Sequence, residues 1–531
     1  MLLRTAGGLL ALLLVACTGS DPAADGMVLR RGNSAEPATL DPHRAKGIPA
    51  NNILRDLYEG LVGEAPDGSL TPGAAARWDI SADGRTYTFH IRDNARWSNG
   101  APLTAQDFVY SLRRIVTPDT GSSFADILTP IQNAAAIIAG EAPPESLGVA
   151  ALDEKTLRIT LAAPTPYFLA LLTDASAYPV YRPAIEQYGD AFVRPGRLVS
   201  NGAYQLADWR PQAHLTLTRN PHYWNAAATR IDTVRYFPLP DQAAELARYR
   251  AGELDITYTV PLEQLPWIRE YFAEELKIAP WLGVFYLGLN TSRPPLDDAR
   301  LRQALAIAVD RQVLTSAITA GGEQPAYGWV PPVNNYTPQQ AAWAALPRAE
   351  QLALAKRLYR EAGYDPAHPL QLELLYNTHR DYKRIAEAVA SMWRDALGVQ
   401  TTLVNQEWKV YLQTRADLAQ TQVFRAGWIG DYNDANAFAE ILACTHGLND
   451  TGYCNPDYDA LLTRAASEQD PTTRRAILEK AERLLLRDMP AIPLYFYATR
   501  RLVKPAIGGY QANIMDHHYS KNLYFQPAPA Q

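Results

Sequence analysis

A strand–helix–strand succession in the second half of the chain most constrains its fold. Residues 370–378 (LQLELLYNT) predict a strand, 384–398 (RIAEAVASMWRDALG) predict a helix, and 400–408 (QTTLVNQEW) predict a second strand. Two strands that are joined through a helix in this way pair in parallel within one sheet. This part of the chain therefore predicts an α/β domain.

Further helices and strands are predicted along the rest of the chain. Thr104 precedes a run that is apolar on one side, and Asp107 holds the capping-box position, so a helix is expected to begin there and continue to residue 116. Gly363 ends the helical pattern of 347–362. The remaining predictions are helices at 51–61, 241–252, 298–318 and 471–488, and strands at 28–30, 86–91, 156–161, 214–219, 254–260, 281–290, 423–429 and 492–503.

Size and charge narrow the possible functions. The 531 residues are about three and a half times a typical domain, and 47% of them are hydrophobic, so the chain can bury a large core. Lys and Arg total 50 against 56 Asp and Glu, and this net charge of −6 argues against a nucleic-acid-binding protein. We expect a mixed α/β protein of two or more lobes, in which a cleft between lobes is a favoured ligand site.

The N-terminus has the pattern of an export signal. Arg4 precedes an apolar run from Leu9 to Ala16, which is too short to span a bilayer. The run ends in Leu14-Val15-Ala16-Cys17, which resembles the bacterial lipobox, so we expect residues 1–16 to be removed and Cys17 to carry a lipid. Residues 17–26 would then be a flexible tether outside the cytoplasmic membrane. The alternative is an ordinary signal peptide with an incidental cysteine.

Two further cysteines, Cys444 and Cys454, lie ten positions apart in a Gly/Asn/Asp-rich segment. In an oxidising compartment such a pair is expected to form a disulfide, and the alternative is two free thiols. A metal site is not expected, because these residues and His446 lack the paired spacing of tetrahedral zinc sites. The adjacent His517 and His518 lie in a loop-like context and are expected to be a surface pair.

Sequence motifs of catalysis were not found. The chain has no G-x-S-x-G, H-E-x-x-H, P-loop or G-x-G-x-x-G motif, and no cofactor is indicated. The 56 acidic residues could always supply a pair of carboxylates, so their number is not informative for glycoside hydrolysis. The pattern favours a binding receptor over an extracytoplasmic hydrolase without excluding the hydrolase.

The segment 423–433 (VFRAGWIGDYN) has the features of a ligand-binding strand. Gly427 and Gly430 flank Trp428 and Ile429, and glycine lets another backbone approach closely. An extended ligand could add to this strand by main-chain hydrogen bonds. Asp431 could then pair with an α-ammonium group and Arg425 with a carboxylate. The alternative is an ordinary strand with its tryptophan in the core and its aspartate capping a turn.

Several longer motifs resemble one family, the substrate-binding proteins of peptide ABC transporters (extracellular solute-binding protein family 5), which include receptors for oligopeptides and for murein tripeptide. The resemblance covers essentially the whole mature chain, and WSNGAPLTAQDFVYS is its most recognisable segment, with Asn99 where the family usually has Asp. The matching segments are LDPH (40–43), RDLYEGL (55–61), WSNGAPLTAQDFVYS (97–111), NGAY (201–204), RNPHYW (219–224), RYRAGELDI (248–256), LVNQEWKVYLQTR (403–415) and RLVKPAIGGY (501–510).

The resemblance implies a bilobed periplasmic-binding-protein fold of the large three-segment type with an extra domain. One lobe would combine residues 27–48, 180–282 and 499–531, the extra domain would be 49–179, and the other lobe would be 283–498. The lobes would close over the ligand as on a hinge. The implied partners are a peptide, the membrane permease of an ABC importer and, through Cys17, a membrane, and the protein is expected to be a monomer in the periplasm or at the cell surface.

The resemblance also implies a set of site residues. Asp431 matches the residue that pairs with the peptide N-terminus, and Arg415 and Arg425 match residues that receive C-terminal carboxylates. Tyr382 replaces a histidine with that same role. The implied ligand contacts are Asp431, Trp428, Gly427, Ile429, Arg425, Trp408, Arg415, Tyr110, Glu36 and Tyr382. The disulfide positions of the receptor match Gly283 and Ile429, neither of which is cysteine, so a Cys444–Cys454 bond would be a different one.

The expected function is therefore a lipid-anchored, non-enzymatic receptor that binds peptides between its lobes and delivers them to an ABC importer. One alternative keeps the fold but changes the ligand to a murein tripeptide, a metal chelate such as nickel, haem or an oligosaccharide. The other alternative is an extracytoplasmic hydrolase or a chaperone-like surface protein.

Overall fold

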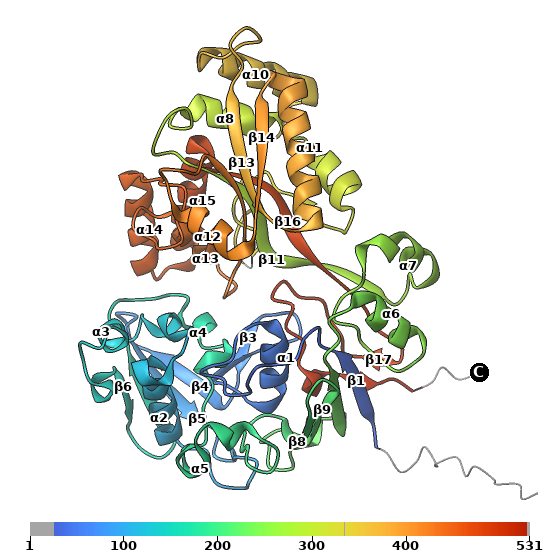
Figure 1. The fold of residues 1–531 in the computed structure, drawn as a ribbon. Coiled ribbons are helices and arrows are strands. Elements are labelled where there is room, and N and C mark those ends of the chain that lie inside the picture. Colours follow the sequence, from blue (N-terminus) through green and yellow to red (C-terminus); the bar gives the residue numbers. More distant parts are fainter. Residues whose placement is uncertain (1–25, 334, 528–531) are drawn as a thin grey trace, which may run out of the picture.

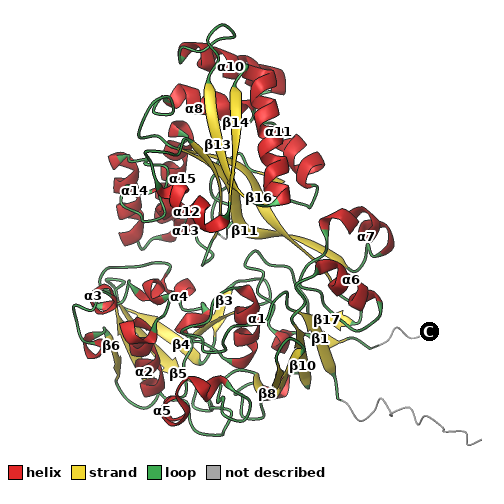
Figure 2. Ribbon diagram, viewed as in Figure 1, coloured by secondary structure: helices red, strands yellow, loops and turns green. Residues whose placement is uncertain are grey.

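The computed structural model describes residues 26–333 and 335–527, which form two lobes (Figure 1). The predicted signal peptide 1–16, Cys17 and the tether up to residue 25 lie outside the described residues. Within the described residues, no helix combines the length and the apolar character that a membrane crossing requires. Figure 2 shows strands at the centre of both lobes with helices around them.

The upper lobe is built on a six-stranded mixed sheet with the strand order β12-β16-β11-β15-β13-β14. The predicted strand–helix–strand unit is confirmed, because β13 and β14 pair in parallel and α11 connects them. The elements of this lobe are β11 Leu276–Leu289, α8 Ala299–Ala308, α9 Arg311–Val313, β12 Gln324–Pro325, α10 Arg348–Glu361, β13 Gln371–Asn377, α11 Arg380–Leu397, β14 Gln400–Gln406, α12 Trp408–Ala416, β15 Val423–Ile429, α13 Asn436–Ala439, α14 Pro456–Ser467, α15 Pro471–Asp488 and β16 Ala491–Leu502.

The lower lobe contains two four-stranded sheets. One has the order β1-β10-β9-β8 and the other the order β4-β5-β7-β6. The second sheet is covered by α2, which begins at the predicted capping box: the Thr104 hydroxyl and the Asp107 carboxylate each accept from the other residue's backbone N–H. The elements are β1 Val28–Gly32, α1 Ile48–Leu57, β2 Val62–Glu64, β3 Leu70–Pro72, β4 Ala75–Ile80, β5 Thr86–Ile91, α2 Ala105–Val116, α3 Ala134–Ile138, β6 Val149–Ala151, β7 Thr156–Thr160, α4 Phe168–Leu171, α5 Arg182–Tyr188, β8 Tyr204–Arg210, β9 His214–Arg219, β10 Thr233–Phe237, α6 Gln242–Arg250, α7 Leu265–Tyr271, β17 Ile507–Gly508 and β18 Tyr524–Phe525.

The strands β11 and β16 connect the lobes as an antiparallel ribbon. They pair from Leu276 opposite Leu502 in the lower lobe to Gly288 opposite Ala491 in the upper lobe, with a register shift between Pro280 and Val284 (Figure 1). The predicted domain boundaries at 282/283 and 498/499 fall inside these two strands. A bulge bends a ribbon and changes its twist, so the register shift is a natural place for the lobes to pivot.

The segment 513–521 lies deep in the lower lobe against residues from the start of the chain. It neutralises carboxylates that are almost fully buried, including those of Glu59 and Glu64, each 5% exposed. His517 and His518 therefore do not form the expected surface pair, because both rings are largely buried against carboxylates. The contacts are Lys521 Nζ to Glu59 Oε1 at 2.7 Å, His517 Nδ1 to Glu64 Oε2 at 2.6 Å, Ser520 N to Asp56 Oδ1 at 2.8 Å and Arg31 Nη1 to Ser520 Oγ at 2.8 Å.

Several predicted elements differ in the structure: the strand expected at 281–290 begins earlier, at Leu276, and the helix expected at 384–398 begins at Arg380. The helix expected at 298–318 is interrupted at Val309, and a new one begins because the Asp310 carboxylate accepts from the Val313 N–H and caps it. The strand expected at 254–260 is reduced to single bridges at Ile256, to Arg31 and Val503. The helix expected at 51–61 begins at Ile48 and ends at Leu57.

Candidate functional site

A cavity of about 750 Å³ lies between the lobes, and Asp431 is part of its wall. The lower lobe contributes Phe124, Asp126, Tyr167 and Asp174 among others, and the upper lobe contributes Trp428, Tyr432, Glu440 and residues 446–448. Asp431 and Asp174 also line an adjoining cavity of about 120 Å³, together with Arg55, Trp281 and His517. Residues from both lobes thus surround one carboxylate, Asp431.

The Asp431 carboxylate lies just beyond the end of β15. The side chain reaches solvent, but the surrounding protein displaces water and, together with the Asp174 carboxylate across the gap, raises its pKa to about 6. No hydrogen bond or ion pair to the Asp431 carboxylate occurs among the described residues. A cationic group placed between these two carboxylates would relieve both the desolvation and the repulsion.

The backbone of β15 next to Asp431 has an open edge. β15 pairs with β11 along its whole length, from Val423 to Ile429, but with β13 only at Val423 and Phe424. Residues 426–429 therefore have no strand partner on that side among the described residues. Unpaired N–H and C=O groups of this kind are what an extended ligand uses when it adds to a sheet.

Gly427 lets the Tyr497 side chain approach β15 closely. The residue is exposed, and a Cβ atom added to it would lie 2.3 Å from the Tyr497 hydroxyl oxygen. Trp428 is turned the other way and half-buried, and its Nε1–H donates to the Ala437 carbonyl at 2.7 Å. Gly427 thus makes room for the Tyr497 hydroxyl, while Trp428 forms part of the wall of the larger cavity.

Arg425 is buried on the same face of β15 as Gly427. Its guanidinium lies 3.5 Å from the centre of the Tyr382 ring, and its Nη1 donates to Asn377 Oδ1 at 3.3 Å. No carboxylate pairs with Arg425 among the described residues. The contacts of the Arg425 guanidinium are therefore with aromatic rings and an amide oxygen. The guanidinium could receive the carboxylate of a ligand.

Arg415, the other predicted carboxylate anchor, already has a carboxylate partner. Its Nε lies 2.6 Å from Asp450 Oδ2, and both side chains are largely buried. Nearby, Trp408 is 47% exposed and stacks on Tyr411 with a centroid distance of 5.7 Å. The structure therefore brings Asp431, Gly427, Trp428, Ile429, Arg425 and Tyr382 onto one strand and its neighbours, and it leaves Arg415 engaged elsewhere.

Two predicted residues lie away from this site. Tyr110 is on the face of α2 that packs against α5, where the Arg182 guanidinium lies 5.3 Å from its ring centre. Glu36 uses both carboxylate oxygens within the lower lobe, accepting from Trp209 Nε1 at 2.5 Å and from the Gln212 N–H at 3.1 Å. Neither side chain lines the cavities around Asp431, so their contact with a ligand stays a prediction.

Other residues line the site without having been predicted. Asp174 caps a short 3-10 turn, Phe124 precedes another, and Tyr167 stacks on Tyr432 across the lobes with a centroid distance of 5.0 Å. Glu440 accepts from Asn436 Nδ2 at 2.8 Å, and burial raises its pKa to about 7. Asp174 could be recognised from the sequence as a capping residue, because its side chain accepts from the Ser176 N–H two positions later. Nothing in the sequence places Asp174 opposite Asp431.

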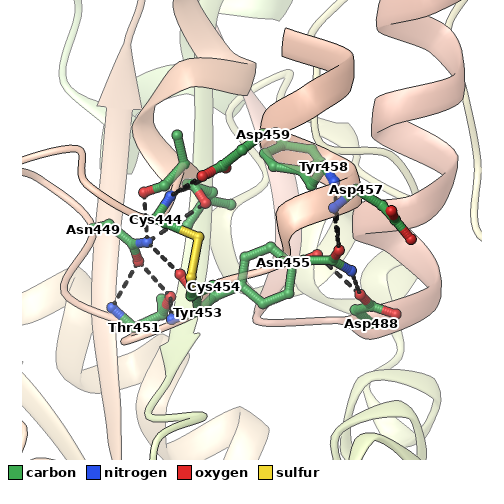
Figure 3. Close-up of a disulfide and its surroundings, with 12 residues drawn as sticks. Cys444, Asn449, Thr451, Tyr453, Cys454, Asn455, Asp457, Tyr458, Asp459 and Asp488 are labelled. Carbon is green, nitrogen blue, oxygen red and sulfur yellow. Dashed lines mark hydrogen bonds between the residues drawn. A yellow bond between two sulfur atoms is a disulfide. The ribbon is translucent and has the colours of Figure 1, made fainter. Parts of the chain in front are cut away.

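The Cys444–Cys454 disulfide and the two positions that match the family's disulfide lie in different parts of the upper lobe. Cys444 and Cys454 form a disulfide with an S–S distance of 2.14 Å, which closes a loop beside the larger cavity (Figure 3). Gly283 and Ile429 are direct cross-strand partners on β11 and β15. The two positions that resemble the family's disulfide are thus adjacent here, while the actual disulfide lies elsewhere.

Comparison with known proteins agrees with this arrangement. The model of bacterial extracellular solute-binding proteins, family 5 Middle, matches residues 69–449. The periplasmic oligopeptide-binding protein OppA of Escherichia coli (strain K12) is 39% identical over 98% of this chain and 97% of its own. The periplasmic murein peptide-binding protein MppA of Escherichia coli (strain K12) is 41% identical over 92% of this chain and 91% of its own.

The fold is also that of a solved relative. The structure of MppA, the periplasmic murein tripeptide binding protein, in its unliganded open form superposes with a TM-score of 0.86 at 39% identity, covering 94% of this chain and 98% of that one. The predicted α/β, bilobed periplasmic-binding-protein fold is thereby confirmed. The chain belongs to the bacterial extracellular solute-binding proteins of family 5.

Proposed function

We propose that this protein binds peptides between its lobes and delivers them to the permease of an ABC importer. The observation that most supports this proposal is the open edge of β15, which ends at Asp431 within the inter-lobe cavity. The ligand's α-ammonium would lie between Asp431 and Asp174, and its backbone would pair with residues 426–429. Main-chain pairing recognises any peptide, because every residue offers the same N–H and C=O groups.

The dimensions fit a short extended ligand. The four residues of the open edge span about 13 Å at the usual rise of a β-strand, which is the length of about four peptide residues. The larger cavity would hold the first side chains, with water filling the space that a small side chain leaves. Relatives named for oligopeptide and for murein peptide binding support both a general and a specialised peptide ligand.

The same proposal includes the anchor, the location and the domains. Relatives described as periplasmic support a periplasmic location, and relatives described as solute-binding proteins support a binding protein rather than an enzyme. We propose that Cys17 carries a lipid and that the protein is a monomer. We also propose three domains: one lobe formed by residues 27–48, 180–282 and 499–531, an extra domain at 49–179, and the upper lobe at 283–498. Mass spectrometry of the mature N-terminus tests the anchor: an unmodified first residue other than Cys17 would refute it.

Calorimetry with free and N-acetylated tri- to pentapeptides tests the binding function. Asp431→Asn and N-acetylation should each weaken binding by about 2–5 kcal/mol, since each removes one member of a charge pair in the closed cleft. Asp395→Asn is the matched control, because it removes an exposed carboxylate of the same lobe far from β15. If free and acetylated peptides bind equally well, Asp431 does not hold the α-ammonium; intact peptide after long incubation excludes a hydrolase.

A further inference from the structure

An ion pair between Arg415 and Asp450 joins α12 to the disulfide loop. Arg415 lies near the end of α12, and Asp450 lies in the loop between Cys444 and Cys454. Their ion pair measures 2.6 Å from Nε to Oδ2, and the side chains are only 19% and 14% exposed. The partial burial limits the screening of this ion pair by solvent and salt.

The loop that presents Asp450 is held on several sides (Figure 3). The Asn449 side chain accepts from the Thr451 N–H and hydroxyl, at 3.2 and 2.6 Å, and donates to the carbonyls of Ala443 and Tyr453, at 2.9 and 2.8 Å. The Thr451 carbonyl in turn accepts from the Thr291 N–H at 2.8 Å. With the disulfide closing the loop, the backbone at residue 450 has little freedom to move away from Arg415.

The same loop forms part of the cavity wall. Residues 446–448 line the larger cavity together with Trp428 and Asp431, so the loop borders the ligand's position directly. A ligand carboxylate arriving at Arg415 would meet the Asp450 carboxylate on the same guanidinium. Two carboxylates on one partly buried cation repel each other and leave one negative charge without a partner.

We infer that Asp450 is a specificity-determining residue: it acts as an internal carboxylate that occupies Arg415 and disfavours ligands whose own carboxylate would lie there. Arg425 has no such partner among the described residues, and it lies six residues before Asp431. The protein would then select peptides whose carboxylate does not depend on Arg415. This inference rests on the proposed peptide-binding function.

A peptide series separates the roles of the two side chains. Free-acid and C-terminally amidated alanine peptides of two to six residues are titrated into wild type, Asp450→Asn, Arg415→Gln and the double variant. The Arg415→Gln variant should have the same ratio of free-acid to amide affinity as the wild-type protein at every peptide length. Asp450→Asn should raise the affinity for the free acid of at least one length tenfold or more, without raising that for its amide, and the gain should vanish in the double variant.

Two controls keep the result decisive. Asp457→Asn makes the same charge change beside the same disulfide but lies on an exposed site without an ion pair to Arg415. The double variant removes both charges of the ion pair, so it leaves neither one unpaired. It therefore tests the inference even where a single variant fails to fold. Its affinities across the peptide lengths, and its ratios of free-acid to amide affinity, should match those of the wild-type protein.

The outcomes are distinct. A tenfold or greater loss of acid preference in Arg415→Gln or in the double variant would show that Arg415 binds the ligand in wild type, and the inference would be wrong. An Asp450→Asn protein that folds but gains affinity at no length would also overturn it. If no free peptide binds wild type, the proposed function fails and the inference fails with it; if peptides bind and only the Asp450 effects are missing, the inference alone fails.

Discussion

Lowering the pH from 7 to 5 should weaken peptide binding about tenfold through the protonation of Asp431. The pKa of this carboxyl is raised to about 6 by desolvation and by Asp174. The carboxylate is therefore ionised in about 90% of molecules at pH 7 and in about 10% at pH 5, and the apparent Kd is the intrinsic Kd divided by that fraction. Affinity is thus fully present above the raised pKa and is lost as the pH falls through it.

The assay is calorimetry with one free-amine tripeptide at half-unit steps from pH 8 to 5. At pH 6, binding should release about half a proton, because the ligand's ammonium holds Asp431 in its ionised form. Heats measured in buffers of different ionisation enthalpy report that release. Asp174→Asn should move the midpoint to lower pH, since it removes the repulsion that raises the pKa.

Other titrating groups near Asp431 need controls. Burial raises the pKa of Glu440 to about 7, so Glu440→Gln is used to separate its titration from that of Asp431. Burial lowers the pKa of His446 and so favours its neutral ring, and His446→Gln is used to separate its titration from that of Asp431. The remaining charged groups that line the two cavities are Asp126, Arg55, Asp516 and His517. A Kd that changes less than twofold between pH 7 and 5, or a pH slope that survives Asp431→Asn, would refute the reasoning.

Four further variants test the site and the fold. Gly427→Val should lower peptide affinity at least tenfold in calorimetry with an unchanged circular dichroism spectrum, because its Cβ would lie 2.3 Å from the Tyr497 hydroxyl oxygen and would displace that ring beside the open edge of β15; unchanged affinity would contradict the edge as binding site. Trp393→Ala should lower the free energy of unfolding in urea by about 3–5 kcal/mol, since the ring is fully buried; a loss below 1 kcal/mol would contradict that packing. Replacing Cys444 and Cys454 by serine should cost about 2–3 kcal/mol in the same assay for a loop of this size, and two free thiols in non-reducing peptide mapping of wild type would exclude the disulfide. Thr104→Ala should cost about 1 kcal/mol through loss of the helix cap, and an unchanged urea midpoint would count against it.

Local patterns were enough to predict most helices and strands, because their causes lie close together in sequence. The capping box at Thr104 and the crossover from β13 to β14 involve residues that are neighbours along the chain or along one helix. The interruption at Val309 was missed because the run is uniformly helical in hydrophobicity, while the break depends on the Asp310 side chain capping the next turn.

The site could be predicted only in part, because its walls come from distant segments. The segment 423–433 shows in its own sequence that Arg425 and Asp431 lie close together on and just beyond one strand, whereas the contact of Tyr110 with Arg182 joins residues that are distant in sequence. Asp174 meets Asp431 only after the two lobes have packed. The Arg415–Asp450 pair likewise depends on how the disulfide loop folds back on α12.

The buried C-terminal segment has a consequence for the order in which the chain can fold. The upper lobe lies within one continuous stretch, so its long-range pairs form without the ends of the chain. The lower lobe must wait for residues 513–521, since until then Glu59 and Glu64 face the interior without Lys521 and His517. Closing a loop of more than 450 residues between His517 and Glu64 is slow compared with pairing within the upper lobe. The docking of residues 513–521 therefore sets the moment at which the lower lobe matures, and a chain cut before residue 513 keeps an unfinished lower lobe.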